Sequence, residues 1–162
     1  MAALTVWRFG DPDAARRALE TLEVFQKQGA VTVQDAATVS WPPERKRPRT
    51  EQHHHLAGPL ALEGAFWGLF FGLLFFVPLL GVAVGAALGA LSGSLADVGI
   101  DDDFIDAVRS EVQPGTSALF VLTSQPVDER VRAAFGDGGA RVIETNLSKD
   151  EEERLRGYFG SM

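Results

Sequence analysis

Cysteine is absent from the 162 residues, and histidine occurs only in the adjacent triplet His53, His54 and His55. Without a thiol the chain forms no disulfide and offers neither a thiolate nucleophile nor a cysteine metal site. Three adjacent histidines point in different directions in any regular element, so they make a poor metal site and a poor catalytic acid or base. Phosphate-binding loop and nucleophile-elbow motifs are also missing. We therefore predict a protein that is not an enzyme and that uses no metal or cofactor.

The chain has fewer basic than acidic residues. The chain has 15 Lys and Arg against 22 Asp and Glu, a formal net charge of −7. This acidity argues against nucleic acid as the main partner. The N-terminal residues lack the basic start and long apolar stretch of a signal peptide, so a cytoplasmic location of the charged part is the default expectation.

Charge of either sign is missing from the run between Gly64 and Ala96. Glycines recur there at four-residue spacing, in two series: Gly64, Gly68 and Gly72, then Gly81, Gly85, Gly89 and Gly93. Because residues four apart share a helical face, each series leaves a bare stripe on which another helix can approach closely. Pro78 separates the two series and predicts a hairpin bend or a sharp kink. The pattern indicates an apolar glycine-zipper helical hairpin.

The two arms of this hairpin differ in bulk. Residues 64–76 carry large side chains apart from the glycine stripe, which predicts an outer, lipid-facing arm. Residues 81–96 have two small faces, one of glycine and one of alanine, which predicts a central position in a homo-oligomer. As helices the arms would be roughly 20 Å and roughly 24 to 28 Å long, against a hydrocarbon core of about 30 Å. A double crossing, a re-entrant hairpin and a soluble assembly that buries the hairpin all remain open.

The rest of the chain predicts alternating strands and helices. Strands are expected over residues 4–9, 31–41, 117–123 and 140–145. Helices are expected from Pro12 to Gly29, from an Asp101 cap through Val108, over residues 128–135, and from a Ser148 capping box onward. The aspartates at 101–103 fit helix capping better than a cation site, because their spacing lacks the calcium-loop pattern.

Apart from the apolar run and the helix that follows it, the element order is strand, helix, strand, then strand, helix, strand. This order predicts an α+β fold with a ferredoxin-like split βαβ sheet. The chain then divides into residues 1–56, the inserted hairpin at 57–98, and residues 99–162. Since both ends of the insert attach to one sheet, they must lie on the same side of any membrane, which excludes a single crossing.

A local basic cluster precedes the apolar run and consists of Arg45, Lys46, Arg47 and Arg49. By the positive-inside rule it places the entrance to the run on the cytoplasmic side. The cluster could also bind anionic lipid headgroups, at about 1 kcal/mol per basic residue. A solvated basic hairpin is the alternative interpretation.

Several motifs together resemble a bacterial family of predicted membrane proteins of unknown function. They are Trp41-Pro42 with Lys46, Pro48 and Thr50, Gly64-Ala65-Phe66-Trp67-Gly68, Phe75-Phe76-Val77-Pro78, the glycine series, Asp97-Val98-Gly99-Ile100-Asp101-Asp102, Pro114-Gly115-Thr116-Ser117-Ala118-Leu119-Phe120 and Thr145-Asn146-Leu147-Ser148. The resemblance implies a prokaryotic protein with a glycine-zipper membrane segment. It carries over no catalytic residue.

These observations favour a non-enzymatic, membrane-associated homo-oligomer with a structural or pore-like role. Its expected partners are copies of itself and membrane lipid, and its expected location is the bacterial inner membrane, with the soluble domain on the cytoplasmic side. One alternative is a soluble, cytoplasmic oligomer with the hairpin buried in its core. Another is a regulatory module that senses a ligand and is anchored by the hairpin.

Overall fold

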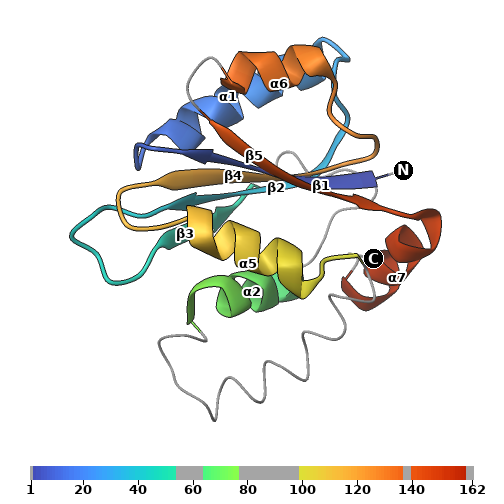
Figure 1. The fold of residues 1–162 in the computed structure, drawn as a ribbon. Helices are drawn as coiled ribbons and strands as arrows, with labels where there is room; N and C mark the ends of the chain where they lie inside the picture. Colours follow the sequence, from blue (N-terminus) through green and yellow to red (C-terminus); the bar gives the residue numbers. More distant parts are fainter. Residues whose placement is uncertain (1, 54–63, 77–98, 137–139, 160–162) are drawn as a thin grey trace.

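Five strands form one antiparallel sheet in the computed structural model, which describes residues 2–53, 64–76, 99–136 and 140–159. The strand order is β3-β2-β4-β1-β5 (Figure 1). The strands are β1 (Ala2–Phe9), β2 (Val33–Ser40), β3 (Arg49–Gln52), β4 (Ser117–Thr123) and β5 (Arg141–Leu147). The predicted α+β class is confirmed, and β4 is a central strand, as its continuous apolar run predicted.

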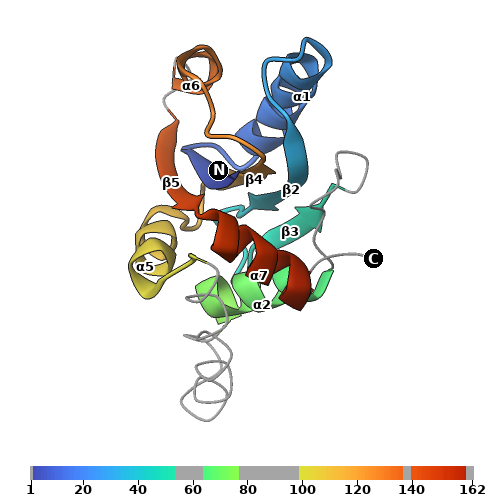
Figure 2. The ribbon, with the colours of Figure 1, turned by 90° about the vertical axis from the view of Figure 1, so that its right-hand side faces the viewer.

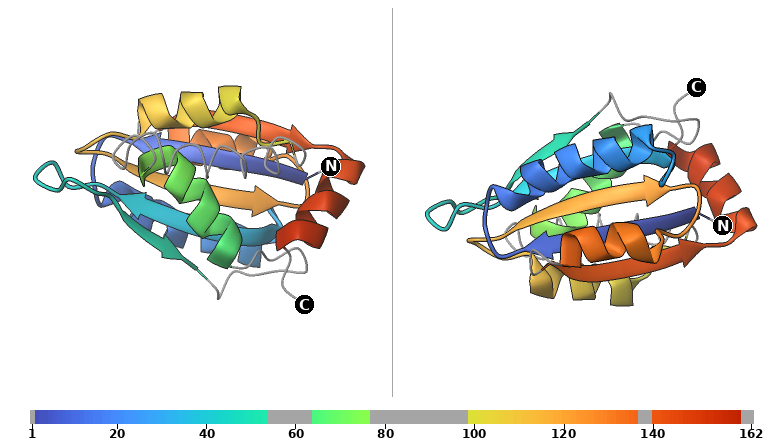
Figure 3. Two further views of the ribbon diagram at one scale, coloured as in Figure 1. Left: turned by 90° about the horizontal axis from the view of Figure 1, so that it is seen from below. Right: turned by 90° about the horizontal axis from the view of Figure 1, so that it is seen from above.

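Helices cover both faces of the sheet (Figure 3). On one face lie α1 (Ala14–Lys27) and α6 (Glu129–Gly136). On the other lie α2 (Gly64–Phe71), its π-helical continuation η2 (Gly72–Phe76), and α5 (Asp102–Glu111). Helix α7 (Lys149–Phe159) follows β5 beyond the end of the sheet (Figure 2).

Each face therefore has its own hydrophobic core. Along β4 the side chains alternate between the two: Leu119 and Val121 face α1 and α6, whereas Phe120 and Leu122 face α2 and α5. A strand covered on both sides buries every residue, which explains why β4 reads as an unbroken apolar run.

A register shift between Val33 and Asp35 explains why Asp35 interrupts the alternating pattern of β2. An extra residue in one strand turns the following side chains to the opposite face. Val33 accordingly packs in the α1 core, while Ala37 and Val39 pack in the α2 core. The shift turns the buried Asp35 side chain toward α2, where it contacts Trp67.

Helix α1 begins at Ala14, so the predicted start at Pro12 is wrong by two residues. The Asp11 carboxylate accepts a hydrogen bond from the backbone N–H of Asp13 at 2.8 Å, which closes a turn ahead of the helix. That bond, and then the ion pair with Arg17, lower the pKa of Asp11. The first turn is capped from β4 instead, because the Ser117 hydroxyl accepts from the N–H of Ala15 at 2.9 Å.

Three other helix ends agree with the sequence signals. Gly29 has φ +76° after the last turn of α1. The Asp101 carboxylate accepts from the N–H of Phe104 at 2.9 Å, and Ser148 and Glu151 exchange hydrogen bonds of 2.8 and 3.2 Å. Strand β3 was not predicted, since its sequence Arg-Thr-Glu-Gln carries no apolar period.

Candidate functional site

The first arm of the apolar run is part of the hydrophobic core of the domain. Six large side chains of α2 and η2 are 0 to 5 % exposed: Phe66, Trp67, Phe70, Phe71, Leu74 and Phe75. Phe120 in the central strand meets the rings of Trp67, Phe70 and Phe71 edge-on, at centroid distances of 6.4, 5.6 and 5.2 Å. The prediction that this arm faces lipid is wrong for these side chains, because they cover one face of the sheet.

A buried carboxylate fixes the arm to the sheet. Asp35 is 0 % exposed, and its Oδ2 accepts a hydrogen bond from the indole Nε1 of Trp67 at 3.2 Å. Its Oδ1 accepts from the backbone N–H of Ala36 at 2.9 Å, and the amide of Gln52 lies 3.4 Å from Oδ2. A buried polar group is costly unless it is hydrogen-bonded, so the bond from Trp67 favours one position of α2 on the sheet.

The far end of the arm is held from two sides. Arg109 of α5 donates from Nε to the backbone carbonyl of Leu74 at 3.2 Å. Trp41 meets the ring of Phe75 at 5.7 Å and 82°. The last described residues of the arm therefore lie between the end of β2 and the end of α5.

The sheet register places the two attachments of the uncharged segment at opposite ends of one face. Arg8 pairs with Arg141, and Ser40 with Arg49, at the end where η2 stops. Gly99 lies at the other end, since its carbonyl accepts from the Thr145 hydroxyl at 3.0 Å. Figure 1 shows η2 ending toward the β2–β3 loop and α5 beginning toward α7. The described residues on either side of residues 77–98 therefore lie on the same face of one domain.

Charge differs between these two ends. At the end near η2, which we name the basic end, the basic residues are Arg8, Arg16, Arg17, Arg45, Lys46, Arg47, Arg49, Arg109 and Arg141, and the acidic ones are Asp11, Asp13, Glu44, Glu51, Asp106 and Glu111. At the end near α7 the acidic residues are Asp101, Asp102, Asp103, Asp150, Glu151, Glu152 and Glu153, with Lys149 and Arg154. A protein of net charge −7 thus presents one positive end.

The predicted headgroup residues lie at this basic end. Arg45, Lys46 and Arg47 are exposed in the loop between β2 and β3, and Arg49 is exposed at the start of β3. The Trp41 indole donates to the carbonyl of Arg45 at 3.0 Å, so the start of the loop lies against Trp41.

An apolar pocket opens beside this loop. It has a volume of about 220 Å³ and is lined by Trp41, Leu74, Phe75, Arg109, Val112, Gln113 and Pro114. Its walls come from η2, from the last turn of α5 and from the end of β2. These three segments are far apart in the sequence, so no local motif could have predicted the pocket.

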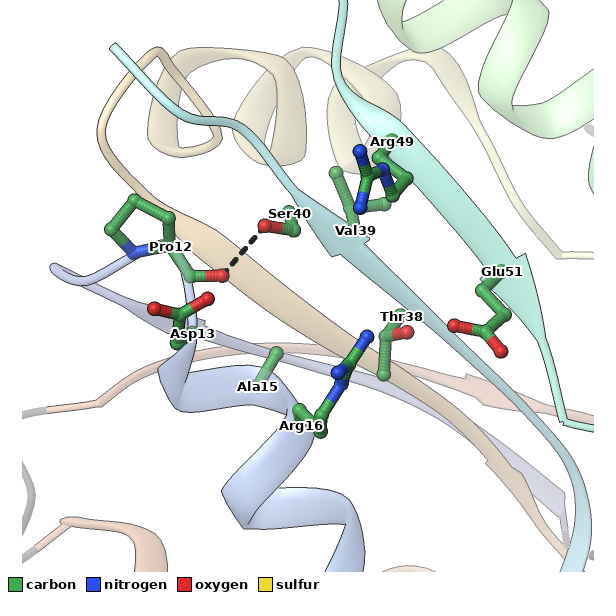
Figure 4. Close-up of a pocket in the computed structure, with 9 residues that line it drawn as sticks. All are labelled: Pro12, Asp13, Ala15, Arg16, Thr38, Val39, Ser40, Arg49 and Glu51. Carbon is green, nitrogen blue, oxygen red and sulfur yellow. Dashed lines mark hydrogen bonds between the residues drawn. The ribbon is translucent and has the colours of Figure 1, made fainter.

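A smaller, polar pocket of about 130 Å³ lies between the first turn of α1 and strands β2 and β3 (Figure 4). Its lining residues are Pro12, Asp13, Ala15, Arg16, Thr38, Val39, Ser40, Arg49 and Glu51. Arg16 extends from α1 and Arg49 from β3, and within the described residues neither guanidinium has an ion-pair partner. The hydroxyl of Ser40 donates to the carbonyl of Pro12 at 2.7 Å, and Thr38 is hydrogen-bonded to the His53 ring at 2.9 Å.

The predicted packing glycines fall into two groups. Gly64 begins α2, and a Cβ at position 68 or 72 would have no described atom within 4 Å apart from the neighbouring residues and the backbone of its own helix. Packing within the described chain therefore does not require glycine at positions 68 and 72. The predicted bend at Pro78 and the second series (Gly81, Gly85, Gly89 and Gly93) lie outside the described residues.

Among the residues that are described, no helix has the length and apolar content needed to cross a membrane.

These features define an α+β domain that carries an uncharged segment between two elements of one sheet face. A family model described as "Protein of unknown function (DUF1269)" matches residues 61–160, which include the whole apolar run and strands β4 and β5. The chain belongs to this family. Searches of curated proteins and of solved structures found no match.

The anchor between Asp35 and Trp67 can be tested by a double-mutant cycle. Trp67→Phe keeps the ring contacts but removes the donor from a buried carboxylate, which should cost about 1–3 kcal/mol of unfolding free energy. Combining it with Asp35→Asn should show a coupling of at least about 0.5 kcal/mol. Urea unfolding of the full chain measures both quantities.

Trp41→Phe is the matched control, since it also removes an indole donor but from an exposed hydrogen bond. Additive effects of the Trp67 and Asp35 substitutions would contradict the anchor.

Proposed function

We propose that the chain is a non-enzymatic, membrane-associated homo-oligomer, in which a folded domain holds an uncharged segment in the bilayer and against copies of itself. The observation that carries this proposal is the position of the segment. Residues 77–96 contain no charge, and the described residues on either side of them belong to one face of one sheet. Such a segment enters and leaves a bilayer on the same side.

Burial of the first arm changes the length available for insertion. With residues 64–76 committed to the core, a hairpin formed by the remaining uncharged residues would have arms of roughly 15 Å, against about 30 Å of hydrocarbon. Two full crossings would need roughly 40 residues. We therefore favour a re-entrant or shallow insertion over a double crossing. Glycine spacing at Gly81, Gly85, Gly89 and Gly93 supports close helix contact between copies.

The domain itself is proposed to be ferredoxin-like. Support comes from the strand order, because β1-α1-β2 encloses β4 and β4-α6-β5 encloses β1, with α1 and α6 on one face. Strand β3 and helices α2 and α5 are then additions to that arrangement. The basic side chains around the end of η2 would contact the cytoplasmic leaflet where the segment begins, in agreement with the positive-inside rule.

Fractionation and sizing test this proposal. The full chain should sediment with membranes, resist alkaline carbonate, and run in mild detergent as one discrete multimer. Gly85→Leu together with Gly89→Leu should reduce the multimer size, because the added side chains block backbone approach. Val84→Leu together with Leu88→Met alters the bulky stripe of the same segment and should leave the size unchanged.

A double glycine variant of unchanged size would show that the glycines are not the interface. A large particle in the supernatant without detergent would favour the soluble assembly, in which copies of the chain replace lipid. A single-chain species in plain buffer would contradict both.

The polar pocket favours a second candidate, the ligand-sensing module. Two guanidiniums without ion-pair partners in the described chain lie in one pocket with the carboxylates of Asp13 and Glu51. This set suits a small ligand with both charges, such as a free amino acid, whose carboxylate would lie between Arg16 and Arg49.

A thermal-shift screen of the full chain against free amino acids tests this candidate. At about 100 times its dissociation constant, a ligand should raise the Tm by roughly 5–10 °C. The shift should be lost in Arg16→Gln and Arg49→Gln, and retained in Arg17→Gln, whose side chain pairs with Asp11 outside this pocket. If no amino acid moves the Tm, or if all three variants respond alike, the pocket is not a sensor of this class.

A further inference from the structure

We infer that the apolar pocket at the basic end is a binding site for one acyl chain of an anionic phospholipid, with the headgroup held by the neighbouring basic residues. The inference rests on the proposed membrane association and adds to it a specific lipid site. A binding site for an anionic phospholipid needs an apolar cavity for the acyl chain and basic side chains beside it for the headgroup. This end of the domain has both.

The cavity is suited to the end of a hydrocarbon chain. Its volume of about 220 Å³ is below the roughly 300 Å³ at which drug-sized ligand pockets begin. Trp41, Leu74, Phe75 and Val112 supply apolar walls, and Trp41 and Phe75 are held edge-to-face at 5.7 Å. A narrow, uncharged ligand fits this lining better than a polar metabolite does.

The rim of the cavity is cationic. Arg109 lines it directly, and its guanidinium is positioned by the hydrogen bond from Nε to the carbonyl of Leu74 and by the ion pair with Asp106. The exposed Arg45, Lys46 and Arg47 follow on the loop whose start is bonded to the Trp41 indole. Tryptophan and basic side chains together are typical of the membrane–water interface.

The charge distribution of the domain favours an anionic lipid as the ligand of this pocket. The whole chain is acidic, so an anionic surface repels most of the molecule and attracts the basic end. The uncharged segment at residues 77–96 also begins at this end, since Phe75 lines the pocket and η2 stops at Phe76. A phospholipid of the adjacent leaflet could therefore reach the pocket from the bilayer to which the segment is attached.

Quenching of Trp41 fluorescence by brominated lipid tests the site. The full chain is mixed with vesicles of phosphatidylcholine, with or without phosphatidylglycerol, in which the bromine is on the acyl chains of one lipid at a time. Trp7 and Trp67 are 0 and 3 % exposed in the protein core, so quenching that disappears in Trp41→Phe reports on the pocket. We expect brominated phosphatidylglycerol to quench several-fold more strongly than brominated phosphatidylcholine.

Lys46→Gln together with Arg47→Gln should weaken the apparent affinity for phosphatidylglycerol about tenfold or more, because two headgroup attractions are removed. Arg130→Gln together with Lys149→Gln is the matched control, since both side chains are exposed away from the basic end and the loss of charge is the same. This control should leave quenching unchanged.

Three results would overturn the site. Equal quenching by the two brominated lipids would show that the anionic headgroup does not contribute to binding at the pocket. Flotation of the protein with vesicles but no Trp41 quenching would reject the pocket while leaving the proposed membrane association intact. Absence of flotation with either vesicle would reject both proposals together.

Discussion

The structure depends on the burial of one aromatic helix against the open face of an antiparallel sheet. Phe66, Trp67, Phe70 and Phe71 exclude water from the face that α1 and α6 leave uncovered, and the hydrogen bond from Trp67 to the buried Asp35 fixes the helix in one orientation. Hydrophobic burial is not directional, whereas a single buried polar contact is. Without this helix, the apolar side chains on that face of the sheet would be exposed to solvent or would need another cover.

This burial divides the uncharged run into two parts with different physical roles. The first part stabilises the domain, so the proposed contacts with lipid and with other copies depend on residues 77–96 alone. Because η2 ends at the basic end and Gly99 lies near α7, the segment is attached across the length of one face. Basic side chains lie around Phe76, the last described residue before the segment, because the ends of β1 and β2 and the starts of β3 and β5 meet at this end of the sheet.

Features with a local cause could be predicted from the sequence, and features with a distant cause could not. The Asp101 cap, the Ser148–Glu151 capping box and the buried strand β4 each depend on neighbouring residues. By contrast, the start of α1 depends on Ser117 of β4, and the face of Asp35 depends on a register shift. The first apolar arm could not be assigned, because a helix that is hydrophobic all round fits a protein core and a bilayer equally well. Both pockets combine segments far apart in the chain, so no spacing signalled them.

Hydrogen exchange of the full chain, followed by mass spectrometry, tests most directly whether the first arm belongs to the folded domain. Amide exchange reports the free energy of local opening, segment by segment. The account predicts that peptides covering residues 66–75 are protected as strongly as β4, with and without lipid or detergent. Fast exchange of this segment in plain buffer, with protection appearing only when lipid or detergent is added, would contradict it.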